Sequence, residues 1–217
     1  MRKKYYCIMG IVLAIVFLSN LPSARPDSQA DAIIKELLKK FEASKNIKVD
    51  FKQKFQWKLT DDYSEQAGTI WLAGKEKFKI ITEDQTIISD GITLWTYSKT
   101  NNQVIIDKVD HAEDINLPRD ILLSYSDLYS ARYLKKEKIE NKDYHFIELF
   151  AKSDEQFIKL IKIWIEEKEL ILLKIEQIDL NENVNEYILA NFILNVPVGA
   201  NFFKYEAPDS VEVIDMR

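Results

Sequence analysis

The stretch Gln85-Thr-Ile-Ile-Ser-Asp-Gly-Ile-Thr-Leu-Trp-Thr-Tyr97 decides the fold class. Two runs of β-favouring residues meet at Asp90-Gly91, and this dipeptide is a strong hairpin signal because both central positions of a type I′ turn need a positive φ. Thr93, Trp95 and Tyr97 then fall on one face of the second strand. Two aromatic rings on the same side need either a packed core or a bound ligand, and the pattern is compatible with both.

Length and composition indicate one globular domain with a sizeable core. The chain has 217 residues, of which 47% are hydrophobic, 12% aromatic and 30% charged, with five Gly and five Pro. These values exclude a disordered or low-complexity chain, and no repeat recurs at a fixed period. We therefore expect a single domain over residues 31–217.

The N-terminus has the parts of a secretory signal peptide. Three basic residues precede an uncharged apolar run from Tyr5 to Leu18, which is too short for a comfortable membrane span. A polar segment with small residues follows this run. We predict a signal peptide over residues 1–24, with the cleavage site between Ser23 and Ala30. An uncleaved membrane anchor is the alternative interpretation.

The expected mature chain is acidic and has no thiol. The only cysteine, Cys7, lies in the apolar run and lacks the small residues that precede a lipid-modified cysteine. Removal of residues 1–24 leaves 27 basic and 35 acidic residues, a formal net charge of −8. This balance argues against nucleic-acid binding and against a strongly basic membrane-binding patch.

An amphipathic helix precedes the first strand. Over residues 31–44, apolar side chains recur at helical spacing between lysines and glutamates. The period then changes to two, and one face of residues 48–58 carries Phe51, Phe55 and Trp57, whereas the other face is almost wholly charged. The pattern predicts a helix that covers a β core, followed by a long antiparallel strand with one solvated face.

The rest of the chain indicates a meander of strands. Short polar turns separate further β-favouring runs at residues 68–73, 77–82, 103–109, 131–140, 144–152, 157–166, 170–179, 186–194, 202–206 and 211–215. Roughly eleven or twelve strands are too many for one open, flat sheet. We therefore predict a mainly β (α+β) fold, an unclosed antiparallel β-barrel of roughly eleven strands with helices against its concave side.

The meander is interrupted over residues 111–129. Leu117-Pro118 begins a run with proline at a first helical position and an acidic residue in the first turn, and both features favour the start of a helix. Ile121, Leu122 and Tyr125 fall on one side of this helix. A short apolar helix between strands is either a lid over a ligand site or a cap on the end of the barrel, and the two roles are compatible.

Catalytic and metal-binding motifs are not found in the sequence. His111 and His145 lie far apart, without a cysteine or ligand-spaced carboxylates nearby, which argues against a zinc site. There is no Gly-x-Ser-x-Gly motif, glycine-rich phosphate loop or P-loop lysine, and we expect no cofactor. The abundant feature is apolar and aromatic side chains on strands, which suits a site for an apolar ligand but also describes an ordinary β core.

The order of these segments resembles the LolA family of periplasmic outer-membrane lipoprotein carrier proteins. The resemblance covers nearly the whole expected mature chain, and it is carried by the N-terminal signal and helix, Phe51-Lys52-Gln53, Gly68-Thr69-Ile70-Trp71-Leu72, Phe78, Ile88 to Tyr97, Asn102-Gln103-Val104 and Phe202 to Asp215. Its most specific part is Ser-Asp-Gly-x-x-Leu-Trp-x-Tyr. One departure is Gly74-Lys75, where family members often carry an Arg-Pro whose arginine ties the lid to the barrel; that role is not transferred to Lys75.

The resemblance implies a function as well as a fold. In the family, a barrel cavity under a helical lid receives the acyl chains of lipoproteins released by an inner-membrane ABC transporter, and the carrier passes them to an outer-membrane receptor. It therefore implies a monomeric, non-enzymatic periplasmic carrier. Two alternatives remain on the same fold: an adaptor that senses stray lipoproteins and signals through a protein partner, and, less favoured, an enzyme that acts on a lipid.

The expected acyl cavity takes its lining from strands and lid. Strand parity groups the side chains but does not tell which face points inward. The predicted lining consists of Phe51, Phe55, Trp57, Ile70, Phe78, Ile80, Trp95 and Tyr97 on strands, with Ile121, Leu122 and Tyr125 on the lid.

Overall fold

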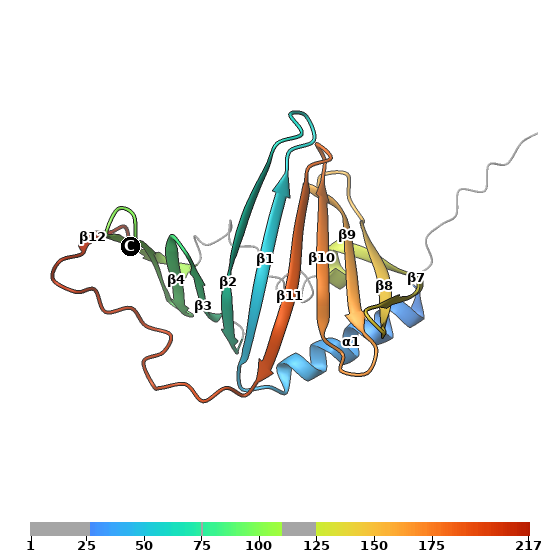
Figure 1. The fold of residues 1–217 in the computed structure, drawn as a ribbon, viewed down its shortest axis with the longest axis horizontal. Helices are drawn as coiled ribbons and strands as arrows, with labels where there is room; N and C mark the ends of the chain where they lie inside the picture. Colours follow the sequence, from blue (N-terminus) through green and yellow to red (C-terminus); the bar gives the residue numbers. More distant parts are fainter. Residues whose placement is uncertain (1–26, 75, 110–124) are drawn as a thin grey trace, which may run out of the picture.

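Among the described residues, twelve strands form one sheet that curls against a helix without closing (Figure 1). The computed structural model describes residues 27–74, 76–109 and 125–217. The helix is α1 (Ser28–Glu42), and residues 125–128 are helical as well. The strands are β1 (Ile47–Gln56), β2 (Tyr63–Ala73), β3 (Lys77–Thr82), β4 (Gln85–Asp90), β5 (Thr93–Ser98), β6 (Gln103–Lys108), β7 (Tyr129–Ile139), β8 (Lys142–Ala151), β9 (Ile158–Glu166), β10 (Leu172–Asp179), β11 (Val184–Leu194) and β12 (Glu212–Asp215).

The two halves of the chain meet at the centre of the sheet. The strand order is β12-β6-β5-β4-β3-β2-β1-β11-β10-β9-β8-β7, so β12 and β7 are the two edges. β1 pairs with β2 on one side and with β11 on the other. β12 runs parallel to β6, whereas the other pairings in the described sheet are antiparallel. The predicted unclosed, mainly β architecture is confirmed.

The predicted strand at residues 202–206 is wrong. Residues 200–203 form turns, and no regular structure follows until β12. The aromatic rings of this segment pack across the sheet: Phe202 lies edge-on to Trp71 with 5.6 Å between ring centroids, and Tyr205 stacks on Tyr97 at 5.4 Å. Aromatic rings are also stabilised when they pack on the face of a sheet from a segment that is not a strand. The aromatic residues of this segment therefore do not by themselves identify a strand.

The two faces of the sheet have different coverings. We call the face that packs on α1 the inner face and the opposite one the outer face. On the inner face, Val49 lies opposite Ile70, and Ile70 lies opposite Ile80, so apolar side chains continue across β1, β2 and β3. The helix buries Ile34 and Leu37 against this face completely. The outer face of β1 carries the lysines and the aspartate of the same strand, as the alternating pattern predicted.

Asp27 fixes the start of α1, which is why the helix begins at Ser28 and not at residue 31. Its side chain accepts a hydrogen bond from the backbone N–H of Gln29 at 3.0 Å, as an N-cap residue does. The second carboxylate oxygen accepts the backbone N–H of Tyr133 on β7 at 2.8 Å. One aspartate therefore caps the helix and ties it to the edge of the sheet.

The Asp90-Gly91 hairpin is confirmed, but its turn is not of type I′. β4 and β5 pair up to Ser89 opposite Leu94, and Gly91 has a φ of 94°, whereas Asp90 is not among the described residues with positive φ. The Asp90 carboxylate instead accepts the backbone N–H groups of Ile92 and Thr93, at 3.0 and 2.9 Å. Hydrogen bonds to the Asp90 side chain thus shape this turn, in place of the positive φ at Asp90 that a type I′ turn would need.

Gly68 allows β2 and β3 to approach under the ring of Phe51. A Cβ at this position would lie 2.2 Å from the carbonyl oxygen of Ile81 and 2.9 Å from Cε1 of Phe51. We therefore predict that Gly68→Ala lowers the free energy of unfolding by about 1–3 kcal/mol, because the backbone must shift to relieve the clash. Urea denaturation measures this change.

The matched control is Gly199→Ala, because a Cβ on Gly199 would meet no atom within 4 Å. It should change the free energy of unfolding by less than about 0.5 kcal/mol. Equal stability of the two variants would contradict the proposed packing at Gly68.

Candidate functional site

The space between α1 and the inner face is the candidate ligand site, and the described residues leave only a small cavity at one end of it. A partly open cavity of about 20 Å³ lies there and is lined only by apolar side chains. These are Phe41, Ile47, Val49, Ile70, Leu72, Leu172, Leu189 and Phe192. Sites that hold an organic ligand usually measure about 300–1,000 Å³. This cavity is therefore too small for an acyl chain unless α1 or the side chains that line it move.

Most of the strand residues predicted to line a cavity lie on the inner face. Phe51, Ile70 and Phe78 are buried in the main core, and Ile80 is half-buried against it. Phe55, further along β1 on the same face, is also half-buried. Beyond the end of β1, Trp57 lies edge-on to the Phe55 ring with 4.8 Å between centroids. Aromatic rings therefore extend from the core to the end of the sheet.

Trp95 and Tyr97 are not brought together with these residues. Pairing of Ser89 with Leu94 puts Leu94 on the inner face and in the main core, so its neighbour Trp95 points to the outer face. Tyr97 has the same parity as Trp95 and stacks on Tyr205. The two rings share one face, as the sequence indicated, but that face is covered by the segment after β11.

Tyr125 belongs to the inner side and contacts α1. Its side chain is buried, and its hydroxyl donates a hydrogen bond to the Asp31 carboxylate at 3.1 Å. Burial and the Asp31 carboxylate raise the pKa of Tyr125 to about 12, so the phenol stays protonated and keeps this bond at neutral pH. Two other predicted lid residues, Ile121 and Leu122, lie outside the described residues.

A row of amide side chains on the inner face was not predicted. We call Gln66, Gln53, Asn185 and Gln177 the amide row; it crosses β2, β1, β11 and β10. Gln66 donates to Gln53, whose Nε2 donates to Oδ1 of Asn185 at 2.8 Å, and Asn185 Nδ2 donates to Oε1 of Gln177 at 3.1 Å. The sequence signal was Gln53 itself, an amide at an inward position between two phenylalanines.

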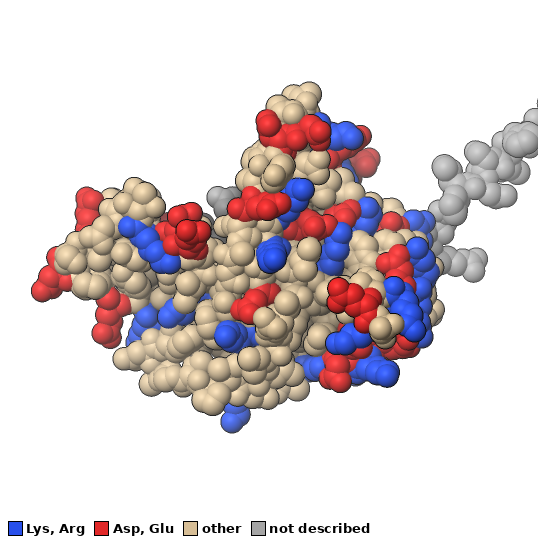
Figure 2. All heavy atoms as spheres, in the orientation of Figure 1, with Lys and Arg blue, Asp and Glu red and all other residues tan. Residues whose placement is uncertain are grey.

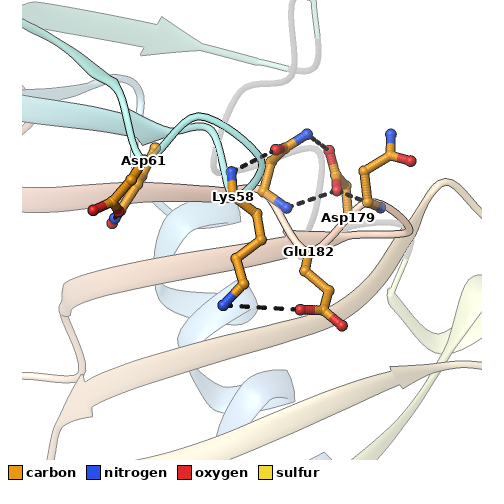
Figure 3. A network of polar contacts seen from close by, with 7 residues as sticks. Lys58, Asp61, Asp179 and Glu182 are labelled. Atoms are coloured by element: carbon orange, nitrogen blue, oxygen red, sulfur yellow. Dashed lines mark hydrogen bonds and ion pairs between the residues drawn. The ribbon is translucent and has the colours of Figure 1, made fainter.

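Two loops at the end of the sheet beyond the amide row are tied together (Figure 3). The Asp179 carboxylate accepts the backbone N–H and the side-chain amide of Asn183, at 2.9 and 2.8 Å. Asn183 in turn accepts the backbone N–H of Lys58 at 3.0 Å, and Lys58 Nζ lies 4.0 Å from Glu182. These contacts join the β1–β2 loop to the β10–β11 loop at this end of the sheet.

The outer face of β9, β10 and β11 carries paired charges. Lys162 forms an ion pair with Glu176 at 2.7 Å, and Lys174 pairs with both Glu176 and Glu186. Burial opposes ionisation of Glu176, but the two lysines outweigh it and lower the pKa of this carboxyl group. Figure 2 shows mixed basic and acidic side chains over the half of the view that Figure 1 assigns to β8–β10.

Two further searches cover only the described part of the chain. No three His, Cys, Asp or Glu side chains there are grouped so that they could hold a metal ion. No helix there combines the length and the apolar character needed to cross a bilayer.

The Tyr125–Asp31 hydrogen bond links residues 125–128 to α1, and its contribution can be measured. Tyr125→Phe keeps the buried ring but removes the bond, so we expect the free energy of unfolding to fall by about 0.5–1.5 kcal/mol at pH 7. Because the folded-state pKa lies above the ordinary value of about 10, this difference should persist up to about pH 10 and shrink as the pH rises through about 12.

The control for this prediction is Tyr205→Phe, which keeps the ring that stacks on Tyr97. Urea denaturation should show nearly unchanged stability for this variant. A loss in Tyr205→Phe as large as that in Tyr125→Phe would contradict the role given to the Asp31 contact.

Comparison with known proteins identifies the family. Residues 42–206 match the family described as "Outer membrane lipoprotein carrier protein LolA". The chain is 33% identical over 135 residues to the outer-membrane lipoprotein carrier protein of Pasteurella multocida (strain Pm70), and the match covers 62% of this chain and 62% of the relative. It is 28% identical to the protein of that name from Psychromonas ingrahamii (strain DSM 17664 / CCUG 51855 / 37), over 99% of this chain and 100% of the relative.

A solved structure shares the fold. The crystal structure of an uncharacterized conserved protein from Thermus thermophilus aligns with a TM-score of 0.59 at 11% sequence identity, over 86% of this chain and 99% of that one. The predicted resemblance is confirmed by the family match, which spans most of the sequence from the end of α1 to the segment before β12. The chain belongs to the LolA family of outer membrane lipoprotein carrier proteins.

Proposed function

We propose that this protein is a periplasmic carrier that binds the acyl chains of lipoproteins between α1 and the inner face of the sheet. The observation that carries the proposal is the covering of a wide apolar face by one amphipathic helix whose inward residues Ile34 and Leu37 are fully buried. Family membership supports the same role, because the members are carriers that bind without catalysing a reaction.

The energetics of transfer suit such a face. Each methylene taken out of water contributes about 0.8 kcal/mol, so an acyl chain of about sixteen carbons is held in a membrane by roughly 10 kcal/mol. A carrier must offer apolar contacts of similar strength, and the inner face of β1–β3 and β8–β11 offers them. The cargo replaces the contacts of α1, so binding strength is the difference between two similar burials and release stays possible.

The proposed acyl site uses only the inner side of the sheet. It includes Phe51, Phe55, Trp57, Ile70, Phe78 and Ile80 on strands, together with Tyr125. Trp95 and Tyr97 are left out because they point to the outer face.

The same family membership supports a proposal for the route of the cargo. We infer that an inner-membrane ABC transporter loads the carrier and that an outer-membrane receptor unloads it, with the carrier acting as a monomer. Residues 1–24, which lie outside the described part, would direct export. Because Asp27 caps α1 and Ala30 is fully buried, we place the cleavage site before Asp27.

Ile80 and Ile81 give a matched test of the two faces. Both are half-buried on β3, but Ile80 packs against the main core on the inner face, whereas Ile81 has the opposite parity. We expect Ile80→Gln to weaken binding of 11-(dansylamino)undecanoic acid by at least about tenfold, since a buried amide without a partner costs about 1–3 kcal/mol. Fluorescence titration measures the Kd.

Ile81→Gln is the control and should bind the probe as the wild type does. The melting temperature of each variant shows whether it is folded. Equal loss in both variants, or no uptake by the wild type, would refute an acyl site on the inner face; turnover of an acyl substrate would favour the enzyme alternative.

Movement of α1 can be tested by tethering it. The Lys40 side chain donates to the carbonyl oxygen of Glu169, so the half-buried Lys40 and the exposed Glu169 place the end of the helix close to the β9–β10 turn. In Lys40→Cys/Glu169→Cys treated with a short bis-maleimide, we expect uptake of the dansyl probe to fall at least about tenfold. Cys7 lies in the predicted signal peptide, so the mature variant contains only the introduced thiols.

The two single-cysteine variants treated with the same reagent are the controls and should bind normally. Normal uptake by the cross-linked protein would show that the acyl chain enters without displacing this end of α1.

A further inference from the structure

The amide row and Tyr187 leave hydrogen-bond donors on the inner face. The hydroxyl of Tyr187 accepts from Nε2 of Gln53 at 2.9 Å and from Nδ2 of Asn185 at 3.3 Å. A phenol has two acceptor lone pairs and one proton, so both lone pairs are used. The Tyr187 hydroxyl oxygen thus accepts both of its side-chain hydrogen bonds from described residues. The hydroxyl proton is left for a further acceptor.

The state of Tyr187 suits a donor. The residue is only 9% exposed and lies within the apolar core cluster, although its side chain ends in a polar hydroxyl group. Burial raises the pKa of Tyr187 above its ordinary value, so the hydroxyl is protonated at neutral pH. A buried O–H without an acceptor costs free energy, and a ligand that supplies one recovers it.

The amide row is polarised toward Gln177. Each NH2 group in the row donates to the next oxygen, from Gln66 to Gln53, then to Asn185 and then to Gln177. Such a chain strengthens the donor at its end. The last NH2 group belongs to Gln177, a side chain only 4% exposed, whose one hydrogen bond to the described residues is the one it accepts from Asn185.

The charges around these donors favour a neutral acceptor. On the core side of the row, the neighbouring inner-face side chains are the apolar Phe51, Leu189 and Ile175. Beyond Gln177 on β10 lies Asp179, whose buried carboxylate is used to hold the β10–β11 loop. An anion at this level would lie in a region of low polarity near another negative charge, which is costly.

We propose that the Tyr187 hydroxyl and the Gln177 amide bind the carbonyl oxygens of the ester or amide links that join acyl chains to the cargo. This inference rests on the proposed function, because it places the hydrocarbon against the apolar core and the link at the level of the amide row. The site would select a neutral acyl link over a charged lipid head group and would fix how deeply the chain enters.

The test compares lipids that differ only in their carbonyl groups. We would measure how 1,2-dioctanoylglycerol and its ether counterpart 1,2-dioctylglycerol, which lacks both carbonyls, displace 11-(dansylamino)undecanoic acid from the full mature protein. We expect the ester to bind about five- to tenfold more tightly than the ether, the effect of one or two net hydrogen bonds. Tyr187→Phe and Gln177→Met should each reduce the ratio of ester affinity to ether affinity, because each removes one of the donors that a carbonyl oxygen would meet.

The controls separate the failure of this inference from that of the proposed function. Tyr205→Phe, on the outer side, should keep the full preference. Equal binding of ester and ether by the wild type would overturn the carbonyl site but leave acyl binding intact, whereas absence of all displacement and of probe uptake would overturn both. Dioctyl phosphate that binds as tightly as the ester would show an anion site and overturn the proposal. If Tyr187→Phe does not fold, the preference of Gln177→Met for the ester over the ether tests the proposal alone.

Discussion

Burial of the apolar side of α1 on the inner face is the interaction on which the rest of the structure depends. A curled sheet that does not close has a concave apolar face, and Ile34 and Leu37 cover it without any exposure of their own. In the carrier function that we propose, the same area accepts hydrocarbon from a membrane. Helix and cargo would then compete for one surface, and the affinity for cargo would depend on how well α1 packs as much as on the surface itself.

The outer face, where we expect no ligand, is covered in other ways. One part of it carries ion pairs such as Lys162–Glu176, whose side chains are partly buried, and aromatic residues of the segment between β11 and β12 pack on another part. That segment places Phe202 on Trp71, and Figure 2 shows the area as largely uncharged. The outer aromatic rings are thus covered by an irregular segment of the chain, whereas the inner face is covered by the amphipathic helix α1.

Patterns within single segments of the sequence predicted strands and turns correctly. They failed where the register between strands decides which face of the sheet a side chain occupies. The alternation in residues 48–58 and the turn at Asp90-Gly91 identified strands and a hairpin, because these depend on neighbouring residues alone. Parity also grouped Trp95 with Tyr97 correctly, yet the face they occupy is set by the pairing of Ser89 with Leu94 and by strands further away. The amide row could not be assembled from sequence for the same reason: its members lie on four strands, and only Gln53 stood out.

The pairing of β1 with β11 has a consequence for how the chain can fold. Ile47 near the start of the described chain lies opposite Leu194 near its end, so the centre of the sheet forms only from segments very distant in sequence. Such contacts have a high entropic barrier, and they make folding slow. A chain emerging from its N-terminus has no partner for one side of β1 until almost all of it has been delivered. The topology therefore delays completion of the core until nearly the whole chain is available, which would suit the export that we propose for this protein.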